Sequence, residues 1–250
     1  MHSYAQTNIQ LLNQLRRDGY SNTELESIYS AYKLVMRLFT GSFRASGKTF
    51  IAHLVGTASI LGHLHVCAKV IAAGLLHAAY AQGDFGGIGK QGISETKRKQ
   101  VSHLVGKEIE EYIAKYTAFS WNERTIPEIY QQLDELGPGD RDVLLIRLAN
   151  ELEEYLDLGI VYCGDTKYQQ YIQREGHLLV EMAQKLGYPT LATELASAIE
   201  DNILAEIPTE LCNPTGHHHS AQIPPKSYQI RIPAWFYHTI GSRIEQRLKL

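Results

Sequence analysis

Apolar residues recur at intervals of three and four along most of the chain, which is the spacing of helices with one buried face. Glycine or proline stands near the ends of many of these segments, where helices commonly stop or begin. Sustained alternation of apolar and polar residues is missing, so the pattern favours an all-α bundle of about ten helices. Apart from one strongly apolar segment, the predicted helices are Tyr4–Arg17, Ser21–Leu38, Thr49–Leu61, Ser94–Val105, Lys107–Phe119, Ile129–Leu136, Asp140–Tyr162, Lys167–Leu186 and Thr190–Ile207.

The segment from Val66 to Tyr80 is apolar almost all the way round instead of on one face. A helix of this kind is buried, and it carries His77 into the interior, where a polar ring must find a partner. His53 lies on the preceding apolar helix. We therefore expect two interior histidines from neighbouring helices to face one cavity at the centre of the protein.

Two stretches depart from the helical pattern. Residues 81–94 contain five glycines and directly follow the segment that carries His77, so they form either a loop that covers a site or a solvated surface loop. From Pro208 onward the chain is proline-rich and includes His217–His219, before a short extended piece at Ile230–Ile232 and a final helix at Pro233–Leu250. The sequence thus predicts a helical domain over residues 1–207 and a C-terminal arm with a terminal helix over residues 208–250.

Composition and charge narrow the class of partner. A net charge of −3 and a pI near 6.4 provide no basic field for nucleic acid. No stretch reaches the roughly 18 apolar residues that span a bilayer, and the N-terminal segment lacks the apolar core of a signal peptide. Cys67, Cys163 and Cys212 match neither a zinc nor a disulfide spacing. We expect a cytoplasmic protein with a small-molecule ligand, and homo-oligomer formation remains open.

Three segments carry a resemblance to a known family: Arg44–His53 reads RASGKTFIAH, Gly74–Tyr80 reads GLLHAAY, and Ile146–Asp157 reads IRLANELEEYLD. This arrangement resembles the HD-domain superfamily of helical metal-dependent phosphohydrolases, and especially the hydrolase domain of the stringent-response (p)ppGpp enzymes. The resemblance covers about Thr40 to Tyr162. It implies an HD-domain-like fold with a hydrolase-like pocket for a small phosphorylated or polar metabolite.

The same resemblance implies a divalent metal (Mn, Fe, Zn or Mg) held by two histidines, the aspartate after the second histidine and a later aspartate. His53 and His77 match the histidines, but Ala78 and Asn150 stand where the two aspartates are expected. Two neutral imidazoles and one amide oxygen are a weak ligand set for a hard cation, which favours carboxylate oxygen. The sequence therefore predicts a degenerate metal site in which His53 and His77 are the candidate ligands.

Candidate roles follow for the polar residues near these motifs. His53 and His77 are either an acid–base pair, a reduced metal site or buried core histidines. Arg44 and Lys48 are candidates to hold a phosphate, with Ser46 as a helix cap in the plainer interpretation. Tyr80 is a candidate hydrogen-bond donor to the substrate, although packing against the core also accounts for it.

A polar stripe on one predicted helix face completes the candidate set, and its members are Arg147, Asn150, Glu151 and Glu154. The stripe is either a solvent face with an Arg147–Glu151 ion pair or a wall of the histidine cavity. In the second case Asn150 orients the substrate, Glu151 replaces a lost carboxylate as ligand or base, and Arg147 binds the substrate. The length of the stripe favours solvent for Glu154.

The sequence is compatible with two functions. One is a hydrolase or related enzyme acting on a small phosphorylated or polar metabolite. The other is a non-catalytic pseudoenzyme that binds a ligand or a protein partner, for which Ala78 and Asn150 argue directly.

Overall fold

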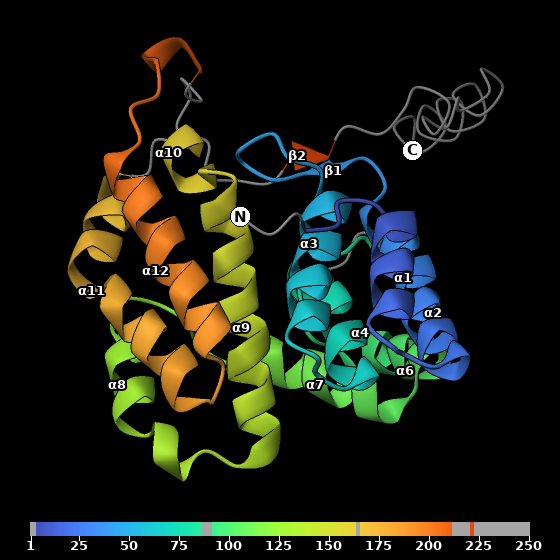
Figure 1. Ribbon diagram of the computed structural model, residues 1–250. Coiled ribbons are helices and arrows are strands. Elements are labelled where there is room, and N and C mark those ends of the chain that lie inside the picture. The colour runs from blue at the N-terminus through green and yellow to red at the C-terminus, as the bar shows by residue number, and fades with distance from the viewer. Residues whose placement is uncertain (1–3, 87–91, 164–165, 212–220, 223–250) are drawn as a thin grey trace, which may run out of the picture.

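The structure is a computed structural model that describes residues 4–86, 92–163, 166–211 and 221–222 (Figure 1). Almost all of its regular structure is helical, which confirms the all-α class. The first group of helices is α1 (Asn8–Arg17), α2 (Asn22–Phe39), α3 (Phe50–His63), α4 (Ala68–Leu76), α5 (Ala79–Gln82), α6 (Glu95–Val105) and α7 (Lys107–Ala118). The second is α8 (Thr125–Gln131), η1 (Leu133–Glu135), α9 (Pro138–Leu156), α10 (Gly159–Cys163), α11 (Thr166–Lys185), α12 (Pro189–Leu204) and η2 (Thr209–Leu211).

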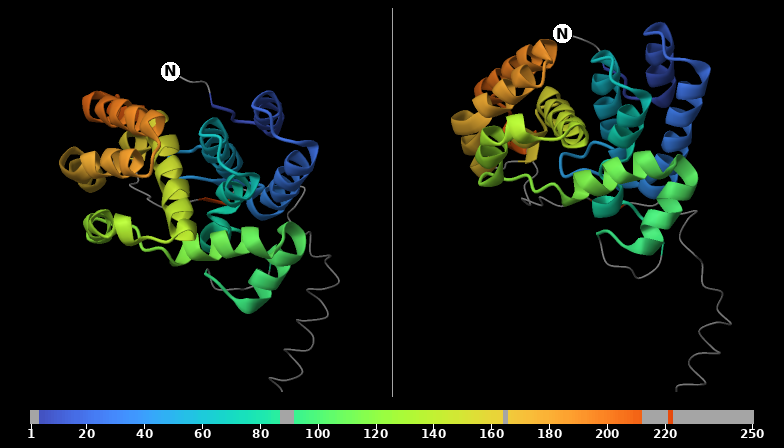
Figure 2. Two further views of the ribbon diagram at one scale, coloured as in Figure 1. Left: turned by 60° about the horizontal axis from the view of Figure 1, so that its bottom comes forward. Right: turned by 90° about the horizontal axis from the view of Figure 1, so that it is seen from below.

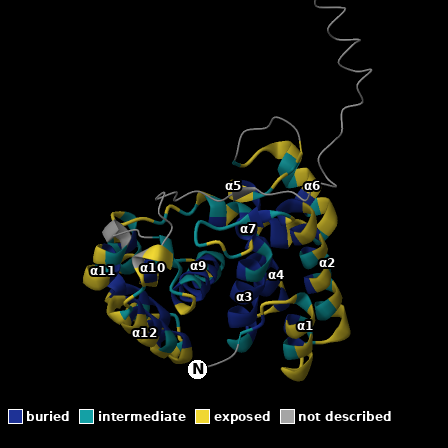
Figure 3. Cartoon of the chain, turned by 90° about the horizontal axis from the view of Figure 1, so that it is seen from above, coloured by how far each residue is buried: buried dark blue, intermediate teal, exposed yellow. Residues whose placement is uncertain are grey.

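Helices α3 and α4 form the centre of the molecule, as their dark colour in Figure 3 shows. Helix α3 packs against α1, α4 and α9, while α4 packs against α2 and α7. Helix α9 joins this part of the chain to α11 and α12, which form the opposite side of the molecule in both views of Figure 2. Burial on every side explains why the sequences of α3 and α4 are apolar all round.

Thr49 sets the start of α3 because its hydroxyl accepts the amide hydrogen of Ala52. The helix therefore begins at Phe50, and His53 lies in its first turn. Ser46, the expected cap, instead lies in a tight turn in which the Arg44 amide donates to the Lys48 carbonyl at 2.8 Å. Gly47 has φ +85° in this turn, a conformation that glycine adopts without strain.

The predicted single helix from Val66 to Tyr80 is wrong in its second half. Helix α4 ends at Leu76, and α5 begins only at Ala79. The His77 ring lies 2.7 Å, Nδ1 to O, from the Gly74 carbonyl and donates to it, in competition with the backbone hydrogen bonds of the helix. The break leaves His77 and Ala78 between two helices and beside a cavity.

The predicted helix from Asp140 to Tyr162 is also divided, into α9 and α10. Leu158 has φ +53° between them, so the helical conformation stops after Leu156. The carbonyl of Tyr155 accepts a hydrogen bond from the side-chain amide of Asn202 on α12 at 2.7 Å, which satisfies a carbonyl at the helix end. In a similar correction, the short helix expected from Ile129 begins at Thr125 as α8, with Pro127 in its first turn.

The described residues contain one small antiparallel sheet, in which β1 (Ser42–Phe43) pairs with β2 (Ala221–Gln222). Ser42 lies opposite Gln222 and Phe43 opposite Ala221, directly before Arg44. The remainder of the predicted arm, with His217–His219, Ile230–Ile232 and Pro233–Leu250, lies outside the described residues. In the described chain, none of the helices is both long enough and apolar enough to cross a membrane.

Candidate functional site

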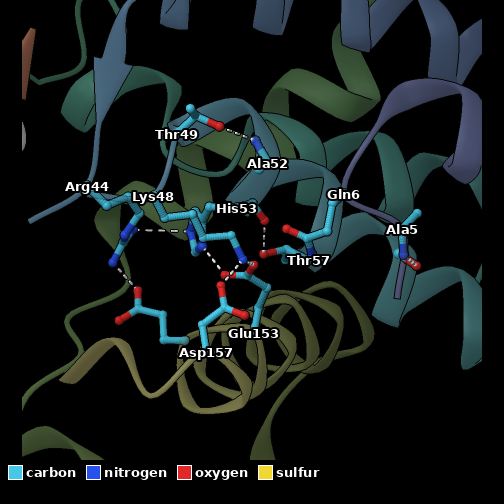
Figure 4. Close-up of polar contacts among 12 residues, drawn as sticks. Ala5, Gln6, Arg44, Lys48, Thr49, Ala52, His53, Thr57, Glu153 and Asp157 are labelled. Atoms are coloured by element: carbon cyan, nitrogen blue, oxygen red, sulfur yellow. Dashed lines mark hydrogen bonds and ion pairs between the residues drawn. The ribbon is translucent and has the colours of Figure 1, made fainter. Parts of the chain in front are cut away.

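His53 lies at the centre of a chain of polar contacts between α3 and α9 (Figure 4). Its ring is completely buried, and Nε2 lies 3.2 Å from Nη1 of Arg44. Arginine can only donate, so Nε2 accepts and the single hydrogen of the neutral ring is on Nδ1. Nδ1 faces a carboxylate oxygen of Glu153 and donates to it. Both ring nitrogens of His53 are therefore hydrogen-bonded within the protein.

Glu153 is the residue on the other side of this contact, and it was not among the site residues predicted from the sequence. Its second carboxylate oxygen accepts a hydrogen bond from Lys48, which also pairs with Asp157. The side chain of Glu153 is only 4% exposed. Its spacing of three residues from Asn150 places the two on one face of α9 and is the signal that could have found it. Gly56 makes room for it on α3, because a Cβ at that position would lie 2.7 Å from Glu153 Oε1.

The electrostatics of this contact keep His53 uncharged. Burial, together with the positive charge of Arg44, lowers the pKa of His53 to about 3. Burial raises the pKa of Glu153, and the nearby Lys48 opposes that rise. The Glu153 carboxylate thus pairs with the Lys48 ammonium and also accepts a hydrogen bond from Nδ1 of His53. The arrangement orients the histidine ring rigidly.

Arg44 connects two cavities. Its Nη2 pairs with Glu154, and both residues line each cavity. The smaller cavity, of about 170 Å³, is also lined by Lys48, Glu153 and Asp157. With Glu154, three carboxylates line it. The larger cavity, of about 350 Å³, is lined in addition by Phe50, His77, Ala78, Ala81, Gln82, Tyr116, Thr117, Arg147 and Asn150.

His77, Tyr116 and Arg147 lie next to one another in the wall of the larger cavity. The rings of His77 and Tyr116 are 4.9 Å apart between centroids, and the guanidinium carbon of Arg147 lies 3.9 Å from the Tyr116 ring centroid. His53 and His77 are also close, with centroids 5.3 Å apart at 77°. Burial, and then the neighbouring His53, lowers the pKa of His77 well below its ordinary value. Because Nδ1 of His77 donates to Gly74, its Nε2 carries the lone pair.

Two buried polar atoms of residues that line this cavity, Nε of Arg147 and the hydroxyl of Tyr116, have no hydrogen-bond partner among the described residues, and the same holds for Nε1 of Trp121. Arg147 also lies 5.8 Å from the Trp121 ring centroid, so the three groups belong to one cluster. No carboxylate of the described chain forms an ion pair with Arg147. Buried donors without partners are costly, and each of these can be satisfied by an acceptor.

The structure brings only some of the predicted site residues to the cavities. Arg44, His77, Arg147 and Asn150 line the larger one, and Lys48 and His53 line the smaller one. The two histidines, expected to face one cavity, therefore line different ones, although their rings are neighbours. Glu151 lines neither and accepts a hydrogen bond from Tyr155 at 3.1 Å. Tyr80 also lines neither, because its hydroxyl donates to Glu110 at 2.7 Å. Glu154, expected in solvent, is only 23% exposed and pairs with Arg44, and the Arg147–Glu151 pair of the plainer interpretation is replaced by the Arg147–Tyr116 stack.

The residues present do not fit the divalent metal that the HD-domain resemblance implies. The two neutral side chains Ala78 and Asn150 supply no anionic ligand, and Nε2 of His53 is already the acceptor for a cation, Arg44. Within residues 4–86, 92–163, 166–211 and 221–222, no three His, Cys, Asp or Glu side chains are grouped so that they could hold a metal ion. A divalent ion would have to displace the Arg44 guanidinium from His53.

Comparison with known proteins gives two similarities. Residues 34–120 match a family described only as a domain of unknown function, DUF6817. A GTP pyrophosphokinase from Streptomyces antibioticus is 24% identical over 171 residues, which are 68% of this chain and 19% of that protein. The chain thus spans about a fifth of the length of that relative. The DUF6817 match includes Arg44, His53, His77 and Tyr116, but stops before α9.

Proposed function

We propose that this protein binds a small phosphorylated metabolite of the nucleotide class in the larger cavity, between Arg44 and Arg147, and that it does so without a metal ion. The metabolite's phosphate oxygens accept hydrogen bonds from the two guanidinium groups. Binding rather than metal-dependent hydrolysis is the function that the side chains of the cavity favour.

One observation carries this proposal: Arg147 is an unneutralised cation beside a cavity. Arg44 has a carboxylate partner in Glu154, but no described carboxylate pairs with Arg147, whose Nε is buried without an acceptor. A phosphate offers several oxygen acceptors and negative charge, and guanidinium groups bind it in a bidentate manner. Tyr116 provides a second donor without a partner at the same place.

The similarity to a GTP pyrophosphokinase makes guanine nucleotides the first ligands to test. A cavity of about 350 Å³ is at the lower end of the range for small-molecule sites. A di- or triphosphate group with part of its nucleoside matches this size.

Hydrolysis of the bound metabolite is the second candidate, and His77 is the observation that favours it. Its ring lines the cavity, and its Nε2 carries a lone pair because Nδ1 donates to Gly74. A neutral imidazole in that position accepts a hydrogen bond from a water molecule and orients it, while its lowered pKa makes it a weak base. Hydrolysis by this route requires no metal ion, so it does not depend on carboxylates at positions 78 and 150.

Isothermal titration calorimetry tests the proposal. The ligands are GTP, GDP, inorganic phosphate and guanosine, and each is titrated without added metal and in excess EDTA. We expect the nucleotides to bind, guanosine to bind much more weakly, and Arg147→Met to weaken nucleotide binding more than about tenfold, since a hydrogen bond to a charged group contributes about 1.5–3 kcal/mol. Arg174→Met, which removes an exposed guanidinium from α11, is the matched control and leaves affinity unchanged.

Absence of nucleotide binding by the wild-type protein, or equal affinity of the Arg147→Met variant, contradicts the proposal. Phosphate release measured on the same samples separates the two candidates. Turnover of GTP in EDTA that is lost in His77→Ala supports hydrolysis, and binding without turnover supports the binding protein.

A further inference from the structure

The guanidinium group of Arg44 is held by side chains of the kinds that usually serve as ligands of a metal ion. Nε2 of His53 accepts a hydrogen bond from Nη1 of Arg44, and the Glu154 carboxylate pairs with Nη2. Imidazole nitrogen and carboxylate oxygen are common ligands of divalent transition metals. Here both are used by one permanently charged side chain, beside a cavity that His77 also lines.

The side chains that contact the Arg44 guanidinium directly supply one negative charge. Glu154 supplies one carboxylate to the guanidinium, while Ala78 and Asn150, which line the same cavity, supply none. Hard divalent ions such as Mg²⁺ and Mn²⁺ are held mainly by carboxylate and other oxygen ligands. Because positions 78 and 150 carry no carboxylate and the described residues contain no group of three His, Cys, Asp or Glu that could hold a metal ion, the site fits the guanidinium of Arg44 better than a hard divalent ion.

Arg44 is also placed to act on a ligand in the way a metal would. Its side chain is 26% exposed and faces both cavities, and a guanidinium carries five N–H donors, of which His53 and Glu154 each engage at least one. The tight turn from Arg44 to Lys48 fixes the backbone from which the side chain extends. Stacking of its guanidinium carbon 5.5 Å from the Phe50 ring centroid restricts it further.

We infer that Arg44 takes the place of the divalent metal ion of this type of site: it is the built-in cation that His53 and Glu154 hold, and it excludes metal ions while presenting positive charge to the ligand. The second half of this statement rests on the proposed function. The exclusion of metal ions does not, because it depends only on the contacts among Arg44, His53 and Glu154.

Restoring the missing carboxylates with and without Arg44 tests this inference. The double variant Ala78→Asp/Asn150→Asp and the triple variant Arg44→Met/Ala78→Asp/Asn150→Asp are compared with the wild-type protein for Mn²⁺ and Zn²⁺ binding by calorimetry. His77→Ala is then added to each variant that binds a metal ion, and loss of metal binding shows that the ion occupies this site. Circular dichroism and thermal unfolding establish that each variant is folded, and the pair Asn150→Asp and Arg44→Met/Asn150→Asp is used if the double variant does not fold.

We expect the wild-type protein to take up neither ion at this site, and the triple variant to bind Mn²⁺ about 10- to 100-fold more tightly than the double variant, because Arg44 no longer competes for His53. Stoichiometric uptake by the wild-type protein that depends on His53 and His77 would overturn the inference. So would equal affinity of the two variants in either pair.

These outcomes are distinguishable from a failure of the proposed function. If nucleotides do not bind the wild-type protein but the metal series behaves as expected, Arg44 excludes metal ions and the ligand proposal is wrong. If nucleotides bind in EDTA, Arg44→Met abolishes that binding while Arg44→Lys restores part of it, since lysine keeps the charge but lacks the bidentate geometry. Equal nucleotide affinity of Arg44→Met and wild type overturns the second half of the inference.

Discussion

Glu153 on α9 accepts a hydrogen bond from Nδ1 of His53 on α3, although the two residues are 100 positions apart in the sequence. This contact joins the two helices at the level of the cavities and fixes which nitrogen of His53 faces Arg44. Lys48 completes it from the turn before α3. The position of Arg44 therefore depends on helix packing as well as on its own turn.

Gly56→Ala should destabilise the protein, because the added methyl group would lie 2.7 Å from Oε1 and 2.8 Å from Cγ of Glu153. Glu153 is buried against α3 and cannot retreat without losing His53 or Lys48, so we expect a loss of about 1–3 kcal/mol in the free energy of unfolding. Urea denaturation measures it. Gly139→Ala is the control, since its nearest neighbour is the mobile end of Lys115, and it should change stability by less than about 0.5 kcal/mol. Equal effects of the two substitutions would show that the close approach of α3 and α9 has no energetic weight.

Glu154→Gln should increase the affinity for phosphorylated ligands. Glu154 competes with an anionic ligand for Arg44, and removal of its charge leaves a more positive cavity. We expect nucleotide dissociation constants to fall about two- to tenfold in calorimetry at low salt, with a smaller gain at high salt. Asp157→Asn provides the comparison, because Asp157 pairs with Lys48 and does not line the larger cavity. A decrease in affinity for Glu154→Gln would place the ligand elsewhere.

Tyr116→Phe should separate stability from binding. The Tyr116 hydroxyl is buried and has no hydrogen-bond partner among the described residues, so its removal should leave the free energy of unfolding unchanged or raise it by up to about 1 kcal/mol. If the hydroxyl donates to the ligand, nucleotide affinity falls about fivefold or more in the same variant. Thermal unfolding with and without ligand measures both quantities. A loss of stability without ligand would reveal an internal partner for the hydroxyl.

Glu110 should make stability depend on pH in the acidic range. The carboxylate is 2% exposed; burial raises its pKa, but hydrogen bonds from Arg98 and Tyr80, each 2.7 Å, outweigh burial and lower the pKa below 4.5. The stabilisation is therefore complete above the unfolded-state pKa and is lost as the pH falls through the lower folded-state pKa.

Glu110→Gln should accordingly cost about 1–3 kcal/mol at pH 7, and its stability should fall less than that of the wild type between about pH 5 and pH 3. Glu111→Gln, whose side chain is 51% exposed, should follow the wild-type curve in urea denaturation at each pH. Parallel pH curves for Glu110→Gln and the wild type would mean that this carboxylate titrates alike in the folded and unfolded states.

The periodicity of apolar residues predicted most helices, because burial of one face is recorded directly in the sequence. The interruptions at His77 and Leu158 were missed, since each depends on contacts that the pattern does not contain: a side-chain hydrogen bond to Gly74 and an amide from α12 at the carbonyl of Tyr155. Spacing placed His53 and His77 on adjacent helices, and their rings are indeed 5.3 Å apart.

The partners of the site were harder to predict than its histidines. Glu153 escaped notice because an acidic residue on a long helix usually faces solvent, and only the packing of α9 on α3 buries it. For Tyr80 the sequence left open a hydrogen bond to the substrate or packing against the core, and the structure shows a buried ring whose hydroxyl donates to Glu110. Side-chain direction at a helix break follows from tertiary contacts and cannot be derived from spacing.

The pairing of β1 with β2 has a consequence for where the working unit of this chain ends. Gln222 and Ala221 lie opposite Ser42 and Phe43, so the backbone that enters the Arg44 turn is restrained by residues that follow α12. A shortened gene product that stops at the end of α12 would keep all the described side chains that line the two cavities and still lose this restraint. Its ligand affinity would then decline more than its helix content.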